Sequence, residues 1–247
     1  MTTSGIVVPC FNEAPRWDAA YWTRILQTVP ARFLFVDDGS VDETRDRIIA
    51  VTAGTESGCL SFSSNRGKAE AVRLGLLELM QDKSVQVVGY LDADGAFAVS
   101  DIARLQTLFQ QLQTLRSIDA LWSSRVALAG RDIQRSDRRH YIGRMVAPMM
   151  SAGYGSIPYD PQSGFKLFRV AEPLRESLSQ AFVTRWLFEV ELLARWRSIC
   201  GRPMNIWEEP VEFWHDVPGS KIRGRELVRI ARDLARVKRE QRRFLTA

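Results

Sequence analysis

The sequence is poor in the residues that build disulfide frameworks and transition-metal sites, with three cysteines and two histidines among 247 residues. Cys10, Cys59 and Cys200 are far apart and form no C-x-x-C pair, so we predict neither a disulfide framework nor a zinc site, and we expect buried free thiols. His140 and His215 are isolated and lack the spacing of metal ligands, so we expect both to be structural or surface residues.

Long apolar runs and two common nucleotide-binding signatures are also missing. No stretch approaches the roughly 20 apolar residues of a membrane span, and residues 1–14 lack the basic and apolar regions of a signal peptide. We therefore expect a cytoplasmic protein. The absence of G-x-G-x-x-G disfavours a dinucleotide oxidoreductase, and Phe62 stands where a P-loop requires its first glycine.

The composition is that of one domain with a basic end. Hydrophobic residues make up 45% of the chain, enough to bury one substantial core, and we find no internal repeat or clear linker. The net charge is +5, but residues 221–247 alone carry +7 and leave the rest near −2. This contrast predicts a local anionic partner for the last residues rather than a field over the whole protein.

Strands and helices alternate along the first half of the chain. Short apolar runs at residues 5–9, 32–36, 59–63 and 85–91 predict buried strands, and the spacing of apolar residues predicts helices over 17–29, 42–51 and 68–81. Ser40 is the expected N-cap of the second helix. This alternation predicts an α/β fold with a mostly parallel central sheet flanked by helices, with the chemistry at the carboxyl ends of its strands.

The second half is less regular. We predict a helix over 100–115 capped by Ser100, a strand over 120–124, a long basic segment over 125–158, a helix over 186–196, a strand over 206–211, and a charged helix from residue 224 onward.

Two carboxylates, Asp92 and Asp94, follow the predicted strand over 85–91 and precede a glycine turn. Because side chains two apart on an extended chain point the same way, both can face one ligand. Hard oxygen ligands suit Mg²⁺ or Mn²⁺ carrying a diphosphate. The alternative is an ordinary solvated acidic turn.

The order of motifs around these aspartates resembles the family-2 glycosyltransferases. Residues 8–13 (VPCFNE), 36–42 (VDDGSVD) and 65–69 (NRGKA) precede or surround the D-x-D in the order of that family. The resemblance implies a GT-A fold, a nucleotide-sugar donor, and Mg²⁺ or Mn²⁺ as cofactor. It also implies donor and metal contacts for a set of residues: Pro9, Asn12, Glu13, Asp37, Asp38, Lys68, Asp92 and Asp94.

Two of these contacts have structural alternatives. Asp37 and Asp38, one of which bonds the base in the family, could instead cap the following helix. The segment around Lys68 opens a predicted helix, where backbone N–H groups and the lysine could receive phosphate, but a bare R-G-K is also a common surface turn.

Later segments look like the polyprenyl-phosphate sugar synthases, and most like the dolichyl-phosphate β-glucosyltransferases. They are residues 162–169 (QSGFKLFR), 185–193 (RWLFEVELL) and 219–222 (GSKI), and the likeness extends from about residue 5 to 240. One departure is Ala96, where related mannose synthases have a glutamine metal ligand. The resemblance implies inverting transfer of a sugar, glucose from UDP-glucose, to a polyprenyl or dolichyl phosphate at the cytoplasmic face of a membrane.

On this reading the chain divides into a nucleotide-sugar-binding half (1–99), an acceptor-side half (100–218) and a basic amphipathic C-terminal helix (219–247). A lipid phosphate is already an oxygen nucleophile and needs positioning more than a strong base. Arginines can hold two phosphates near each other, and the candidates are Arg125, Arg131, Arg135, Arg139 and Arg144. Arg125 and Arg131 match the family's acceptor-side arginines best, and Lys221 is expected on a loop that closes over the diphosphate. A solvated basic face is the alternative for Arg135, Arg138 and Arg139.

A neutral hydroxyl acceptor, soluble or on a protein, would instead require a carboxylate base. Asp160 is the first candidate, followed by Glu189 and Glu191. The alternative for Asp160 is a turn residue in Y-D-P, and the alternative for Glu191 is an ion pair with an arginine.

Six arginines advance by three or four residues along the predicted terminal helix, and an apolar stripe runs beside them. They are Arg225, Arg229, Arg232, Arg236, Arg239 and Arg243. Such a helix can bind an anionic bilayer peripherally, or can pack on its own domain. A nucleic-acid-binding module is a distant alternative, disfavoured because residues 221–243 contain no aromatic side chain. The sequence gives no indication of the oligomeric state.

Overall fold

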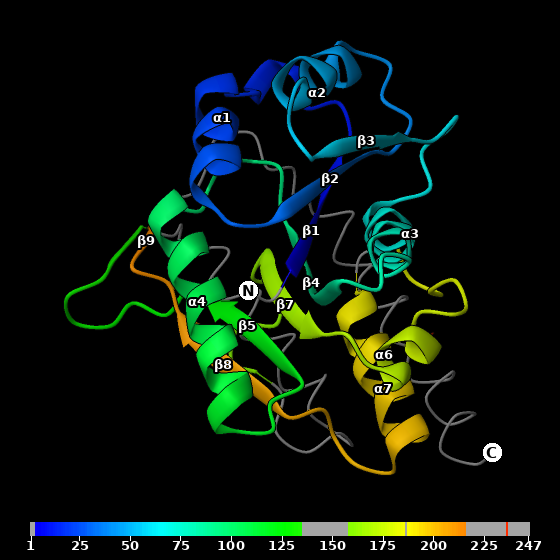
Figure 1. Cartoon of the computed structure of the whole chain (residues 1–247), viewed down its shortest axis with the longest axis vertical. Helices are drawn as coiled ribbons and strands as arrows, with labels where there is room; N and C mark the ends of the chain where they lie inside the picture. Colours follow the sequence, from blue (N-terminus) through cyan, green and yellow to red (C-terminus); the bar gives the residue numbers. More distant parts are fainter. Residues whose placement is uncertain (1–2, 135–157, 186, 216–235, 237–247) are drawn as a thin grey trace.

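The computed structural model describes residues 3–134, 158–185, 187–215 and 236. At its centre lies a seven-stranded sheet with strand order β3-β2-β1-β4-β7-β5-β8 (Figure 1). The strands are β1 (Thr3–Cys10), β2 (Arg32–Asp37), β3 (Gly58–Ser61), β4 (Val85–Leu91), β5 (Ala120–Ser124), β7 (Phe165–Arg169) and β8 (Ile206–Pro210). Only β7 is antiparallel to its neighbours in this sheet. The predicted mostly parallel sheet in a single domain is confirmed.

Helices cover both faces of the sheet (Figure 1). One face packs against α1 (Ala19–Thr28), α2 (Thr44–Thr52) and α4 (Val99–Leu115), and the other against α3 (Lys68–Leu79), α6 (Glu172–Ser177) and α7 (Phe188–Cys200). Successive side chains of β1 point to opposite faces of the sheet, so Ile6 and Val8 pack with the first group of helices and Val7 packs with the second. Strands buried on both faces explain the continuous apolar runs of the sequence.

A second, two-stranded sheet joins β6 (Asp132–Gln134) to β9 (Phe213–His215) beside the main sheet. Trp214 of β9 forms a β-bridge with Phe97, and the two rings lie 4.8 Å apart. Neither short strand was predicted, and β7 and α6 were also missed. In β7 the alternation is hidden because Lys166 is as buried as the apolar residues on either side of it.

Two predicted helix caps are wrong. The helix α2 begins at Thr44, whose N–H donates to Asp42, while the Ser40 hydroxyl accepts from the N–H of Asn12 at 3.0 Å. The Ser40 side chain therefore joins two loops. The helix α4 begins one residue before Ser100, with Ala98 at the cap position.

All three cysteines are free, with Cys10 buried and Cys59 and Cys200 half-buried, so full burial is confirmed for the first alone. Among the described residues no helix is long and apolar enough to cross a membrane. The predicted helix from residue 224 falls outside the described residues apart from Arg236, and so do His140, Arg144 and Lys221.

Candidate active site

One edge of the main sheet gathers most of the predicted site residues. The parallel strands β1, β2, β4, β5 and β8 all end there, and the antiparallel β7 begins there. Because Leu91 pairs with Phe165, the D-x-D that follows β4 meets the loop that precedes β7. The N–H of Asp92 donates to the carbonyl of Gly164 at 2.9 Å.

The loop after β1 is tied to the loop after β2. Pro9 lies in β1 opposite Val36. Asn12 is in the left-handed region (φ 53°), and its side-chain oxygen accepts from the N–H of Val41 at 3.0 Å. Glu13 is buried, its N–H donates to the Thr44 hydroxyl at 2.7 Å, and its carboxylate pairs with Arg16. These bonds fix the first two motifs relative to each other.

Asp38 braces a third loop. Its two carboxylate oxygens accept from the N–H groups of Arg66 and Gly67, each at 2.7 Å. Burial raises the pKa of Asp38 although these two donors act to lower it. Asp37, also buried, accepts from the N–H of Ser40 at 3.1 Å. Neither aspartate caps α2 in the way that the structural alternative required, and contact with a base stays a prediction for both.

The start of α3 is clamped by Arg185, a residue whose role the sequence did not indicate. Its guanidinium donates to the carbonyls of Asn65 (2.8 Å) and Arg66 (3.2 Å), and its own carbonyl accepts from the N–H of Ala69. Gly67 has φ 97°, and a Cβ there would meet Arg185 Nε at 2.7 Å. A glycine is thus required for the close approach that orients the following lysine.

Lys68 reaches from the start of α3 to the D-x-D. Its Nζ lies 2.6 Å from Asp92 Oδ1. Burial acts to lower the pKa of Lys68, but the charges of Asp92 and Glu189 outweigh it and the pKa is raised, so the ammonium stays charged. Burial and the neighbouring Asp92 raise the pKa of Asp94, and the charges of Arg16 and Lys68 oppose that shift. Beyond burial, the raised pKa of Asp94 reflects repulsion between the charges of Asp92 and Asp94, and a cation bound between the two carboxylates would relieve that repulsion.

The D-x-D leaves room for nothing larger than glycine on one side. A Cβ added to Gly164 would collide with the Asp92 carboxylate. Among the described residues no three His, Cys, Asp or Glu side chains are grouped so as to hold a metal ion by themselves. Mg²⁺ and Mn²⁺ commonly use one or two carboxylates and complete their coordination with substrate phosphates and water, so Asp92 and Asp94 fit such an ion.

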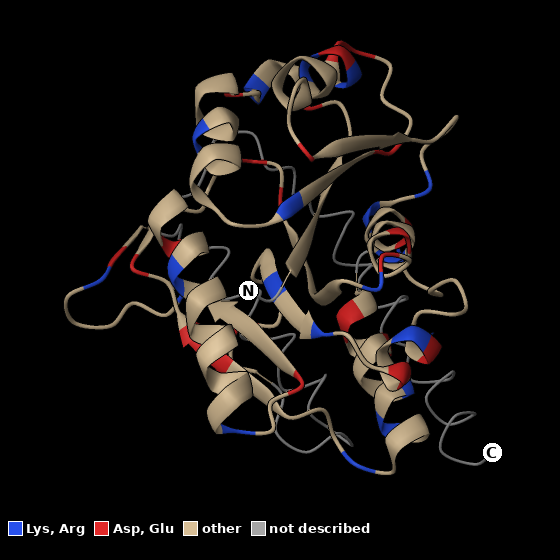
Figure 2. Ribbon diagram, in the orientation of Figure 1, with Lys and Arg blue, Asp and Glu red and all other residues tan. Residues whose placement is uncertain are grey.

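A buried lysine lies in β7, the strand that pairs with β4 just before the D-x-D. Lys166 is 0% exposed, and its Nζ donates to the Tyr90 hydroxyl at 2.8 Å and the Ser163 carbonyl at 2.6 Å, with Glu189 Oε1 at 3.5 Å. The Tyr90 hydroxyl in turn donates to Glu189 Oε1 at 2.7 Å. Burial lowers the pKa of Lys166 to about 8, against the opposing charge of Glu189. Figure 2 shows most of the strand residues as uncharged, whereas β7 carries basic residues along its length.

On the other side of β7, Arg125 follows β5 and forms a bidentate pair with Asp160. Its Nε and Nη2 donate to the two Asp160 oxygens at 2.7 and 2.8 Å, and its guanidinium lies 5.0 Å from the centre of the Trp214 ring. The backbone N–H groups of Tyr159 and Asp160 both donate to Glu208. This geometry favours a role for Asp160 in orienting Arg125 over that of a general base.

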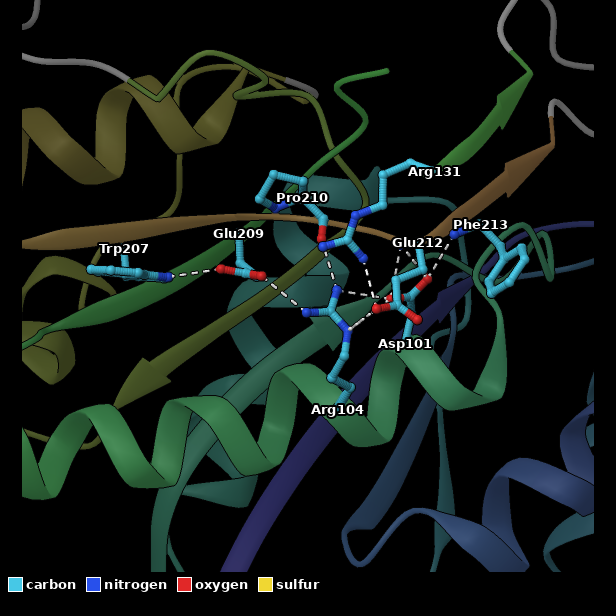
Figure 3. A network of polar contacts seen from close by, with 8 residues as sticks. All are labelled: Asp101, Arg104, Arg131, Trp207, Glu209, Pro210, Glu212 and Phe213. Atoms are coloured by element: carbon cyan, nitrogen blue, oxygen red, sulfur yellow. Dashed lines mark hydrogen bonds and ion pairs between the residues drawn. The ribbon is translucent and has the colours of Figure 1, made fainter. Parts of the chain in front are cut away.

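Arg131 lies in a different ion-pair network, shown in Figure 3. Its Nη1 is 2.7 Å from Glu212 Oε1, and the N–H of Glu212 donates to the buried Asp101 of α4. Arg104 joins Asp101 to Glu209 at the end of β8. Arg131 therefore belongs to a network separate from the Arg125–Asp160 pair, and a direct role in binding an acceptor stays a prediction.

The other two candidate bases are also engaged. Glu189 accepts from Tyr90, as described above, and Glu191 pairs with Arg195 at 2.6 Å and accepts from the N–H of Val183. The ion pair considered as the alternative for Glu191 is thus present.

A mostly parallel sheet with a D-x-D after β4, flanked by the braced loops that follow β1 and β2, is the architecture of the GT-A glycosyltransferases. The model of glycosyl transferase family 2 matches residues 5–128, half of the chain. The chain belongs to this family and is a nucleotide-sugar-dependent glycosyltransferase.

Over most of this chain, the similarity is to enzymes named dolichyl-phosphate beta-glucosyltransferase. The one from Saccharomyces cerevisiae is 26% identical, over 93% of this chain and 72% of the relative. The human one is 27% identical, over 88% and 68%, and the one from Drosophila melanogaster is 29% identical, over 88% and 68%.

Solved structures share the fold. Glucosyl-3-phosphoglycerate synthase from Mycobacterium tuberculosis superposes with a TM-score of 0.67 at 18% identity, over 97% of this chain and 80% of that one. A complex of that enzyme with Mn²⁺ and UDP-glucose gives a TM-score of 0.63 at 18% identity, over 97% and 79%. At this identity the likeness establishes the GT-A fold.

Proposed function

We propose that the enzyme transfers glucose, with inversion, from UDP-glucose to dolichyl phosphate or a similar polyprenyl phosphate. The observation that carries this proposal is the oriented arginine Arg125 at the same sheet edge as Asp92 and Asp94. In this arrangement Arg125 would be the phosphate-binding cation on the acceptor side, and Asp92 and Asp94 the carboxylate pair on the donor side. The names of the relatives that match most of this chain support glucose as the sugar and dolichyl phosphate as the acceptor.

The donor side would bind the nucleotide through its three braced loops. Asn12, Glu13, Asp37 and Asp38 would surround the nucleoside, and Lys68 would contact the diphosphate as Lys221 closes over it. Asp92 and Asp94 would hold Mg²⁺ or Mn²⁺, which when bound neutralises charge on the leaving nucleoside diphosphate. Lys68 already approaches Asp92 at 2.6 Å, so a small movement of its ammonium would bring it to an anionic ligand beside that carboxylate.

The acceptor side would position a phosphate rather than deprotonate a hydroxyl. A phosphomonoester has its second pKa near 6, so at neutral pH it attacks as an anion without a general base. Asp160, with both oxygens accepting from Arg125, would hold that guanidinium in place. Arg131 and Arg144 would add charge around the acceptor.

Access to a lipid acceptor would come from peripheral binding to an anionic membrane, through the predicted arginine stripe over residues 225–243. Each basic residue near such a surface contributes about 1 kcal/mol, and salt screens the attraction. Co-sedimentation with vesicles of rising anionic lipid content, at low and high salt, tests this. A protein that stays in the supernatant throughout would remove the membrane contact from the proposal.

The function is tested with a panel of labelled nucleotide sugars, each with Mn²⁺ or with EDTA. Dolichyl phosphate is offered alongside a soluble acceptor, phosphoglyceric acid. We expect label from UDP-glucose in the lipid fraction, only with the metal. Transfer to phosphoglyceric acid alone would replace the lipid acceptor with a soluble hydroxyl, and transfer from another nucleotide sugar would change the donor.

A further inference from the structure

A fully buried ion pair lies directly behind the candidate active site. We call Lys166, Tyr90 and Glu189 the Lys166 cluster; its members come from β7, β4 and the first turn of α7, and all are at most 3% exposed. Removing an ammonium and a carboxylate from water costs several kcal/mol per ion, so such a pair rarely adds net stability over apolar residues of similar size. Within the described residues Glu189 Oε2 has no hydrogen-bond partner, which increases that cost.

The Lys166 cluster holds the loop that precedes β7. Lys166 Nζ donates to the carbonyl of Ser163, and the Ser163 hydroxyl lies 2.5 Å from that of Ser123 in β5. The next residue, Gly164, accepts the Asp92 N–H and lies against the Asp92 carboxylate. The backbone fixed by Lys166 is therefore in direct contact with the D-x-D.

The other end of the same loop orients the acceptor-side arginine. The carbonyl of Asp160 accepts from the N–H of Ser163 at 3.1 Å, and the Asp160 carboxylate holds Arg125 in the bidentate pair. Residues 160–164 thus touch Asp92 at one end and Arg125 at the other. One buried ammonium fixes the segment between them.

We propose that Lys166 is a positioning residue that sets the distance between the donor and acceptor halves of the site. Held by Tyr90 and Glu189, its ammonium fixes residues 160–164 so that Asp92 and Arg125 face one reaction centre. This inference rests on the proposed function for the identity of the two halves. It assigns a role in orienting the site to a buried charge whose own hydrogen bonds go to Tyr90, Ser163 and Glu189.

The test compares two charge-neutral double variants. Lys166→Met with Glu189→Gln removes both charges of the Lys166 cluster, so neither is left unpaired. The control, Asp119→Asn with Arg202→Met, removes a buried carboxylate and one of the two arginines that pair with it, Arg202 and the half-exposed Arg169, at the opposite end of the same sheet, where Asp119 precedes β5. A third variant, Tyr90→Phe, removes one hydroxyl and keeps both charges.

We measure thermal stability, the Kd of UDP with Mn²⁺ by calorimetry, and kcat and KM for glucose transfer. Loss of a residue that orients metal ligands typically lowers affinity or activity 10- to 100-fold, and we expect a loss of about that size for UDP–Mn²⁺ binding and kcat in the Lys166/Glu189 variant. Tyr90→Phe should lose about fivefold, as for one ordinary hydrogen bond. The control should lose thermal stability while its Kd and kcat stay at the wild-type values.

Wild-type Kd and kcat in the Lys166/Glu189 variant would overturn the positioning role, and so would equal losses in the control. If the double variant does not fold, Tyr90→Phe decides, and unchanged binding and kinetics there contradict the proposal. If the wild type binds UDP–Mn²⁺ but transfers no glucose, the proposed function fails, and the binding measurements still decide the role of Lys166.

Discussion

The proposed donor and acceptor halves of the site are built in different ways. On the donor side, loops that each directly follow a strand are braced by hydrogen bonds to the backbone, as in the two bonds from Arg66 and Gly67 to Asp38. On the acceptor side the central feature is an ion pair between residues 35 apart, Arg125 and Asp160. Both sides therefore depend on contacts between separate loops, but the donor side is braced by backbone N–H groups of the motif-bearing loops and the acceptor side by a pair of side chains.

The two halves also differ in the charges that surround their carboxylates. Asp94 is destabilised by burial and by the charge of Asp92, which raises its pKa. Asp160 is buried too, but it receives a bidentate guanidinium. Removing a carboxylate should therefore relieve repulsion on the donor side and remove an attraction on the acceptor side.

The largest expected effect breaks the donor side. Asp94→Asn should lower kcat by about 10³-fold, because a ligand of the metal that stabilises the leaving diphosphate is lost, at several kcal/mol. Its melting temperature should equal or exceed that of the wild type, since a repelling charge is removed. Steady-state kinetics and a thermal melt check both parts, and wild-type turnover would refute the metal role.

A smaller effect is expected on the acceptor side. Arg125→Lys keeps the charge but loses the bidentate geometry, and we expect kcat/KM for the acceptor to fall roughly 100-fold while the Kd of UDP is unchanged. Asp160→Asn should cause a loss of similar kind, and the double variant should lose little more than either single one. Additive losses would mean that Asp160 acts independently of Arg125, as a general base would.

Gly164→Ala tests the contact between the two halves. The added methyl group would displace the Asp92 carboxylate, and a shift of about 1 Å at a reacting centre can cost up to 10²-fold in rate. Gly58→Ala is the matched control because nothing lies within 4 Å of its Cβ position. Equal kinetics of the two variants would show that Asp92 can move without loss.

The smallest effect concerns an arginine-bound carboxylate outside the site. Arg202 holds the pKa of Asp119 below its usual value, against the opposing effect of burial. A lowered pKa in the folded state adds stability that is present above the unfolded value near 3.9 and lost as pH falls through the folded one. Asp119→Asn should therefore lower the melting temperature by roughly 2–10 °C at pH 7, and by less below about pH 4. A difference in melting temperature between the wild type and Asp119→Asn that is the same at pH 7 and below pH 4 would contradict this assignment.

The contrast between the halves also explains how much could be predicted from the sequence. The strands β1, β2, β4, β5 and β8 are found within two residues of their predicted positions. For β1, β2 and β4 the reason is that a strand buried on both faces has a continuous apolar run. The GT-A fold and the family were likewise predicted correctly from the ordered motifs of the first half.

Three features that the sequence did not reveal share a physical cause, which is contact between distant residues. Ser40 has the residue type of a helix cap, but its hydroxyl is taken by the N–H of Asn12. Lys166 breaks the apolar pattern of β7 because its charge is satisfied by Tyr90, 76 residues away. Arg185 clamps the start of α3 from 120 residues away. No local pattern encodes such pairs, so they became visible only in the folded chain.

The central claim is that Asp92 and Asp94 bind a nucleoside diphosphate through a divalent metal ion, and calorimetric titration of UDP with Mn²⁺ and with EDTA tests it most directly. We expect wild-type affinity to rise at least roughly tenfold with Mn²⁺, within the usual range of coupling between two ligands, and we expect Asp94→Asn to lose that gain. Equal affinity of the wild type for UDP with and without Mn²⁺, or an undiminished gain in Asp94→Asn, would contradict the account.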